Sequence, residues 1–265
     1  VVFKTEIVKR YKNGTDATRD FLEIEKFLHY LPVDERLHLI LDKENFKALV
    51  ELSEEILPYV IADSAKDYTI LDFLSNALEF GEIKIENEHV IELNLCNLDL
   101  SKFPKSVLKF KSLKVLNLRN NKLKELPREI GHLKSLNELW LNNNKIVNLP
   151  DSVCKLENLE KLWISKNKLK RLPANLGELL MLRKLNLSRN SLEILPESVC
   201  KLKKLERIIL YDNHLSELPE CLFELKSLTY INLRRNNFKR YLEALEKIEN
   251  IGSKIKIDID FGKEN

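Results

Sequence analysis

Hydrophobic residues recur with a period of 23 residues through most of the chain after its first eighty residues. Each period contains two aliphatic residues that flank one variable residue, a pattern that predicts a short strand with one apolar face. Asparagine and proline keep the same interval, at Asn121, Asn144, Asn167, Asn190, Asn213 and Asn236, and at Pro104, Pro127, Pro150, Pro173, Pro196 and Pro219. So strict a repeat predicts a solenoid, in which each unit buries its apolar face against the next unit.

The repeating unit is LxxLxLxxNxLxxLPxxhxxLxx, where h is aliphatic, and seven copies begin at Val90, Leu113, Leu136, Leu159, Leu182, Leu205 and Leu228. This unit resembles the leucine-rich repeat in its 23-residue intracellular form, the subgroup of the plant Ras-group-related proteins and the Ras-pathway scaffolds. The resemblance extends over residues 90–250. It implies an α/β solenoid, an arc with a concave parallel sheet, in which asparagine amides bond the backbone of neighbouring turns.

Both ends of the array have segments that we expect to close it. Glu82–Leu95 predicts a strand that enters the first repeat through a turn at Asn87-Glu88, and Lys254–Asp260 alternates as a closing strand. Helical periodicity fills much of the first eighty residues, at 21–32, 34–41, 46–58 and 70–81. We therefore expect a small, mainly helical domain over residues 1–81, either a cap or a separate accessory domain, and a repeat domain over residues 82–265.

The variable residues of each strand point away from the leucines and are predicted to line the concave face. Two tryptophans follow each other on adjacent strands there, with tyrosines and basic residues on the later strands. Since Trp, Tyr and Arg are enriched in binding hot spots, we expect a partner-binding site. Its predicted residues are Trp140 and Trp163 as anchors, Tyr211 and Tyr230 as further contacts, and Lys161, Lys184, Arg207 and Arg234 as charge partners. Two alternatives stay open, namely tryptophans that only stack on each other and basic residues that only confer solubility.

Charge is unevenly divided along the chain. Residues 1–81 carry 10 Lys or Arg against 16 Asp or Glu, whereas residues 82–265 carry 34 against 25. The basic concave face predicts a protein partner with an acidic surface. The family resemblance adds small Ras-like GTPases as a candidate partner class. Two other hypotheses are nucleic-acid binding by the basic, aromatic face and autoinhibition by the acidic N-terminal segment.

Motifs of catalysis and cofactor binding are missing from the sequence. It contains no GxxxxGK[ST] or GxGxxG loop and no HExxH, and its four cysteines match neither a zinc pattern nor a disulfide framework. We therefore predict a scaffold for signalling rather than an enzyme, with no cofactor and no metal. Because no apolar run is long enough for a membrane span and no signal peptide is found, we expect no membrane partner and a reducing, cytoplasmic setting.

Overall fold

The computed structural model describes residues 41–60, 82–238 and 255–259 of the 265-residue chain. The chain divides into two compact units, residues 1–40 and residues 41–265. The first unit lies outside the described residues, as do the predicted helices over 21–32, 34–41 and 70–81. All that follows concerns the second unit.

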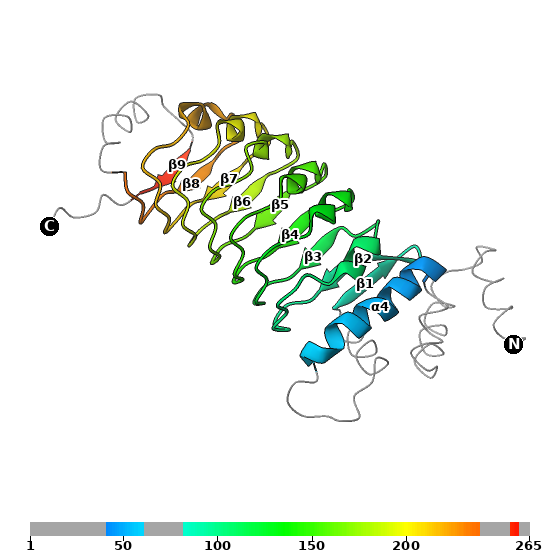
Figure 1. Cartoon of the computed structure of the whole chain (residues 1–265). Coiled ribbons are helices and arrows are strands. Elements are labelled where there is room, and N and C mark those ends of the chain that lie inside the picture. The colour runs from blue at the N-terminus through cyan, green and yellow to red at the C-terminus, as the bar shows by residue number, and fades with distance from the viewer. Residues whose placement is uncertain (1–40, 61–81, 239–254, 260–265) are drawn as a thin grey trace, which may run out of the picture. The chain divides into compact units, whose positions relative to one another are not determined.

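Nine strands form one sheet in the order of the sequence (Figure 1). Strand β1 (Ile83–Glu86) runs antiparallel to β2 (His89–Asn94), and β2 to β9 are parallel. The remaining strands are β3 (Val115–Asn117), β4 (Glu138–Trp140), β5 (Lys161–Trp163), β6 (Lys184–Asn186), β7 (Arg207–Ile209), β8 (Tyr230–Asn232) and β9 (Lys256–Asp258). The predicted hairpin turn and the closing strand are therefore confirmed.

The period of the sequence becomes the lateral register of the sheet. Leu116 pairs with Leu139 and Leu139 pairs with Leu162, so each strand residue lies beside the residue 23 positions further on. These three leucines are completely buried. Each column of equivalent residues thus has one chemical environment along the sheet, which explains why aliphatic residues recur there.

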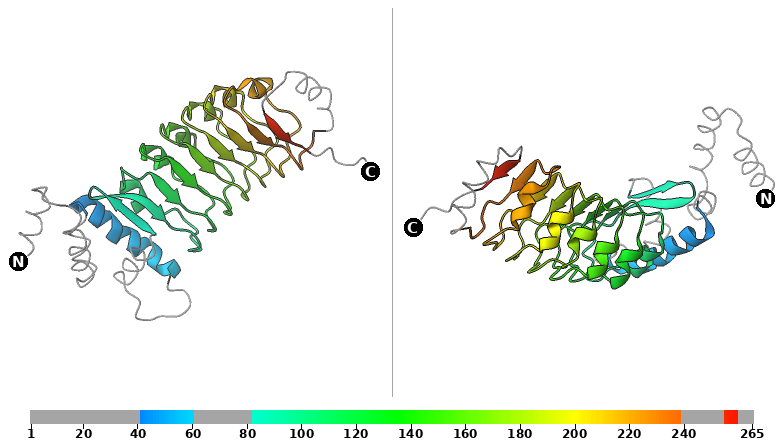
Figure 2. Two further views of the ribbon diagram at one scale, coloured as in Figure 1. Left: turned by 180° about the vertical axis from the view of Figure 1, so that it is seen from behind. Right: turned by 90° about the horizontal axis from the view of Figure 1, so that it is seen from above.

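The opposite side of each of the first six repeats is a short 3-10 helix (Figure 2, right). These segments are η1 (Lys105–Lys109), η2 (Arg128–His132), η3 (Asp151–Lys155), η4 (Leu176–Glu178), η5 (Glu197–Lys201) and η6 (Glu220–Glu224). All but η4 follow a proline directly, at φ between −57° and −69°. Proline fixes the backbone angle that starts the return segment, as the sequence predicts. Ile130 and Leu133 fill the core from this side and are completely buried.

One helix covers the N-terminal end of the repeat array. Helix α4 (Lys43–Val60) packs on η1 and buries one face, formed by Ala48, Leu49, Leu52 and Ile56. The Glu55 carboxylate accepts a hydrogen bond from the backbone N–H of Ser106, at 2.9 Å, and Lys109 forms an ion pair with Glu51. The helix predicted over residues 46–58 is thus present and caps the first repeat. The domain boundary at residue 81 stays a prediction.

Within the described ranges, no helix has both the length and the apolar character of a membrane span.

Candidate functional site

The concave face consists of the outward-pointing residues of strands β2 to β9. In β4 and β5 the central leucine is buried and its two neighbours are only partly buried, as strand alternation predicts. Trp140 therefore stands on this face beside Trp163, its register partner on the next strand. The structure brings the two predicted anchors together near the middle of the sheet.

The two indole rings stack on each other. Their centroids are 5.1 Å apart and their planes differ by 6°. The guanidinium of Arg119 lies over the ring of Trp140, 4.9 Å from its centroid, so three side chains from consecutive repeats form one stack. The stack of Arg119, Trp140 and Trp163 is named the tryptophan stack below. The stacking that one of the two open alternatives expects is therefore observed, whereas its other half, that the rings bind no partner, stays a prediction. Stacking leaves the ring edges rather than both faces for a partner.

The two indole N–H groups differ in their hydrogen bonding. Nε1 of Trp140 donates to Oε2 of Glu138 at 3.0 Å, and the other carboxylate oxygen of Glu138 accepts from Lys161 at 2.6 Å. Nε1 of Trp163 is buried and has no hydrogen-bond partner among the described residues. An unsatisfied buried donor costs free energy, so hydrogen bonding is incomplete at the centre of this face.

The predicted tyrosines also have cationic neighbours. The guanidinium of Arg207 is 3.9 Å from the ring centroid of Tyr230. Arg189 and Arg235 both lie over Tyr211, at 5.8 and 5.6 Å.

The hydroxyl group of Tyr230 donates to the carboxylate of Asp258 at 2.6 Å, and this hydrogen bond raises the pKa of Tyr230 above its usual value. The Tyr230 hydroxyl thus links β8 to the closing strand.

A column of three cations crosses strands β5, β6 and β7. Lys161 pairs in register with Lys184, and Lys184 pairs with Arg207. Adjacent strands are about 4.8 Å apart, so these charges repel one another. Glu138 compensates Lys161, whereas Lys184 has no ion pair among the described residues. Arg234, the eighth predicted residue, is exposed one repeat further on, just after β8.

Sequence reasoning did not identify the partners of the aromatic rings. Arg119 and Asp258 contact predicted site residues but were not among them. For Arg119 a signal existed, because it occupies a variable concave position on the repeat that precedes Trp140. For Asp258 the sequence offered no signal, because the closing strand lies outside the 23-residue register.

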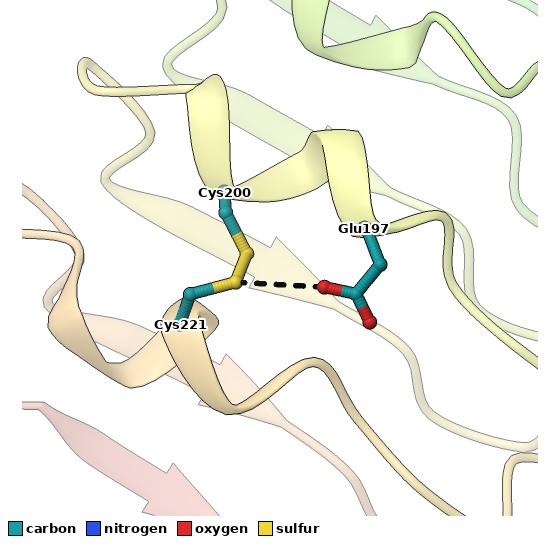
Figure 3. Close-up of a disulfide and its surroundings, with 3 residues drawn as sticks. All are labelled: Glu197, Cys200 and Cys221. Carbon is teal, nitrogen blue, oxygen red and sulfur yellow. Dashed lines mark hydrogen bonds between the residues drawn. A yellow bond between two sulfur atoms is a disulfide. The ribbon is translucent and has the colours of Figure 1, made fainter.

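The expectation that the cysteines form no disulfide is wrong. Cys200 on η5 and Cys221 on η6 form a disulfide with their Cα atoms 5.7 Å apart, and a Glu197 carboxylate oxygen lies 3.9 Å from Sγ of Cys221 (Figure 3). A separation of 21 residues matches no familiar spacing, but the solenoid brings these two positions together. In earlier repeats, Gly131 and Ser152 occupy the positions equivalent to Cys200 and Cys221. These two segments also pack closely, because a Cβ added to Gly131 would lie 2.4 Å from the carbonyl oxygen of Ser152.

Thiol chemistry at the two remaining cysteines is limited by burial. Cys154 is 2% exposed, and burial, with smaller contributions from Glu178 and Asp151, raises its pKa to about 12. Cys96 is half-buried. Glu197, Cys200 and Cys221 are the described residues whose ligand atoms converge, but both sulfur atoms belong to the disulfide and offer no thiolate.

Comparison with known proteins agrees with the repeat architecture. Residues 85–179 match the leucine-rich repeat region family and residues 180–238 match the leucine rich repeat family. A leucine-rich repeat protein of Leptospira interrogans is 38% identical with a TM-score of 0.60, over 63% of this chain and 42% of that chain. The internalin InlF of Listeria monocytogenes is 23% identical with a TM-score of 0.50, over 62% of this chain and 45% of that chain, and shows likeness of fold alone.

This chain thus spans less than half the length of either solved relative. No curated protein sequence matches it. The two family matches together cover more than half of the chain, and the strand register, the buried asparagines and the capped ends agree with them. The chain belongs to the leucine-rich repeat family.

Proposed function

We propose that this chain is a non-catalytic scaffold that binds a protein partner on its concave face. Leucine-rich repeat domains generally mediate protein–protein interaction, and this chain presents a surface of suitable chemistry. The observation that carries the proposal is the tryptophan stack at the centre of the sheet, beside the cation Lys184, which has no ion pair within the described ranges. Aromatic anchors surrounded by charged groups are the usual composition of binding hot spots.

The stack supplies a rigid apolar anchor. Trp140 and Trp163 hold each other in place, so little side-chain entropy is lost when a partner covers their exposed edges. Arg207 and Lys184 lie on the strands that follow and would steer an acidic surface toward the anchor. Tyr211, Tyr230 and Arg234 extend the same surface toward the closing strand.

The partner that fits this chemistry is a protein with an acidic surface. A small Ras-like GTPase is one candidate, proposed from the family resemblance only. The cytoplasm is the proposed setting for such a complex, and there the Cys200–Cys221 pair would be reduced. Masking of this face by the acidic residues 1–81 is a regulatory variant of the same proposal. It predicts tighter partner binding by a chain that lacks residues 1–81, and circular dichroism must establish that this chain is folded because the deletion also removes helix α4.

Nucleic acid is the less favoured ligand because each aromatic ring of this surface already has at least one face occupied. Single-strand binders stack bases on open rings. Here one face of Trp140 lies against Trp163 and the other under Arg119, while guanidinium groups cover Tyr211 and Tyr230. Glu138 and Asp258 also place carboxylates on this surface.

Substitution of the anchors tests the proposal. Trp140→Ala/Trp163→Ala should lose the proteins that the wild type captures in a pull-down, because the central apolar contact is removed. A matched control is Leu180→Ala/Ile194→Ala, which removes two side chains that are 58% and 54% exposed and lie outside the strands. Circular dichroism establishes that each variant is folded.

A second variant separates binding from folding. Lys184→Glu should weaken capture and raise the melting temperature slightly, because it reverses a charge that Lys161 and Arg207 repel. Equal capture by the wild type, the tryptophan variant and Lys184→Glu would contradict the proposal.

A further inference from the structure

A row of residues with left-handed backbone angles follows the strands, one in each repeat. The row consists of Asn97, Asn120, Asn143, Lys166, Arg189, Asp212 and Arg235, all at φ between 54° and 60°. Asparagine tolerates this conformation better than most residues, whereas long side chains such as lysine and arginine are disfavoured there. Asparagine occupies the first three positions, as this backbone favours.

The first three side chains form a neutral ladder. Nδ2 of Asn120 donates to Oδ1 of Asn97 at 2.8 Å, and Nδ2 of Asn143 donates to Oδ1 of Asn120 at 3.0 Å. Neighbouring members of the row are therefore within contact distance of each other. The same turn geometry continues in the later repeats, so asparagine would suit the backbone there as well.

The later repeats replace this ladder with cations. Lys166, Arg189 and Arg235, which we name the cationic row, are all exposed. Each of these residues has a left-handed backbone angle that its side chain disfavours. Their charged groups stand at the positions where the first three repeats have hydrogen-bonded amides. Unfavourable backbone conformations concentrate at functional sites, where another requirement selects the residue. The property that Lys166, Arg189 and Arg235 share is positive charge.

Among the described residues, a carboxylate lies near Arg189 of the cationic row and none forms an ion pair with Lys166. Asp212, between two cations of the row, has its carboxylate 4.0 Å from Nε of Arg189. The side chain of Lys166 has no ion pair or hydrogen bond among the described residues. On the strands, Lys184 and Arg207 belong to the same repeats as Arg189 and Asp212. The later half of this edge therefore carries excess positive charge next to the tryptophan stack.

We infer that the cationic row, together with Lys184 and Arg207, docks an acidic segment of the protein partner, rich in Asp and Glu. This inference rests on the proposed function of the concave face and adds Lys166, Arg189 and Arg235 as the residues that dock one acidic segment of the partner. The planar guanidinium groups of Arg189 and Arg235 match the geometry of a carboxylate. A protein segment fits better than a nucleic acid because Asp212 lies within the row and the Tyr211 ring is flanked by both arginines.

The inference predicts opposite effects on stability and binding for one substitution. Lys166→Asn should raise the melting temperature by about 1–3 °C, because asparagine suits the angle and its amide can reach Oδ1 of Asn143. The same change should weaken binding of a 20-residue polyglutamate peptide about two- to fivefold, the usual range for one exposed charge pair. The control is Lys155→Asn on η3, which removes one exposed charge from the opposite side and should change neither quantity.

A triple variant measures the whole row. Lys166→Asn/Arg189→Asn/Arg235→Asn should reduce polyglutamate affinity at least tenfold and lower its salt dependence, while Lys184 and Arg207 keep the remainder, as fluorescence anisotropy would show. Unchanged polyglutamate binding by a folded triple variant would overturn the inference. Tighter binding of single-stranded oligothymidine than of polyglutamate by the wild type would also overturn it.

The tryptophan variant separates this inference from the function on which it rests. Trp140→Ala/Trp163→Ala keeps the cationic row, so polyglutamate binding should persist while partner capture falls. If partner capture falls in the tryptophan variant but not in the triple variant, the proposed function stands and only the acidic docking segment is excluded.

Discussion

A single buried amide joins neighbouring repeats. Nδ2 of Asn144 donates to the carbonyl oxygen of Leu118 at 2.9 Å and to that of Leu141 at 3.0 Å. Its Oδ1 accepts from the backbone N–H of Leu123 at 3.0 Å. The two carbonyl oxygens also accept from Asn121 and Asn167 of the neighbouring repeats, at 3.0 and 2.9 Å, whereas the N–H of Leu123 depends on Asn144. No residue of the same size but different polarity could satisfy all three groups.

Replacing this asparagine should therefore cost more than its size suggests. Asn144→Ala leaves the N–H of Leu123 without a partner and removes one of two hydrogen bonds at each carbonyl, so we expect the free energy of unfolding to fall by about 2–4 kcal/mol. Urea denaturation followed by circular dichroism measures it. The exposed Asn148→Ala is the control and should change stability by less than about 0.5 kcal/mol. A loss no larger than that of the control would show that water replaces the amide.

At the scale of elements, the 3-10 helices of neighbouring repeats contact one another on the side opposite the sheet. The disulfide between η5 and η6 joins two of them covalently. The equivalent positions in earlier repeats are Gly131 with Ser152 and Gly177 with Ser198, which pack without a covalent bond. The fold of this edge therefore does not need the disulfide, which reinforces the last repeats.

The contribution of the disulfide to stability can be measured by placing serine at position 221, because Ser152 and Ser198 occupy the equivalent positions in earlier repeats. Cys221→Ser should lower the free energy of unfolding of the oxidised protein by about 3 kcal/mol, because the closed loop restricts the unfolded chain. Dithiothreitol should lower the wild type to the level of the variant and leave the variant unchanged. In the oxidised protein a thiol reagent should label Cys96 well before Cys154, whose pKa is about 12. Equal stability with and without reductant would show that the cysteines are unpaired in solution.

The described repeats stack in one dimension, so the whole molecule depends on its ends. Helix α4 covers the apolar end at β2 and η1, and β9 extends the sheet at the other end. In such an array each repeat contacts only its neighbours, and loss of a cap exposes the adjacent core first. Damage should therefore remain close to the end at which it occurs.

Leu49→Ala tests this property because Leu49 is completely buried between α4 and the array. We expect a loss of about 2–4 kcal/mol in the stability of the N-terminal repeats. Hydrogen exchange should accelerate in β2 and β3 and remain unchanged in β7 and β8. Glu54→Ala, at an exposed position of α4, is the control. Uniform acceleration along all strands would indicate that the array unfolds as one cooperative unit.

Much of the fold could be predicted from the sequence because the repeat converts spacing directly into contact. Residues 23 apart occupy equivalent positions on adjacent strands, so the strands, their register and the buried columns follow from the period. The concave position of Trp140 and Trp163 follows from strand alternation in the same way. Their binding role stays a prediction, and so does the role of the first eighty residues.

Tertiary structure alone decided the contacts that are not multiples of the period. The Cys200–Cys221 bond depends on the path of the return segment between strands, and the placement of Arg119 over Trp140 depends on the side-chain conformation chosen in three dimensions. The backbone angle of Lys166 is likewise a property of the turn and not of the residue. By itself, the sequence determined which positions are equivalent, because chemistry repeats along it, whereas the structure decided which unlike positions meet, because that depends on where the backbone turns.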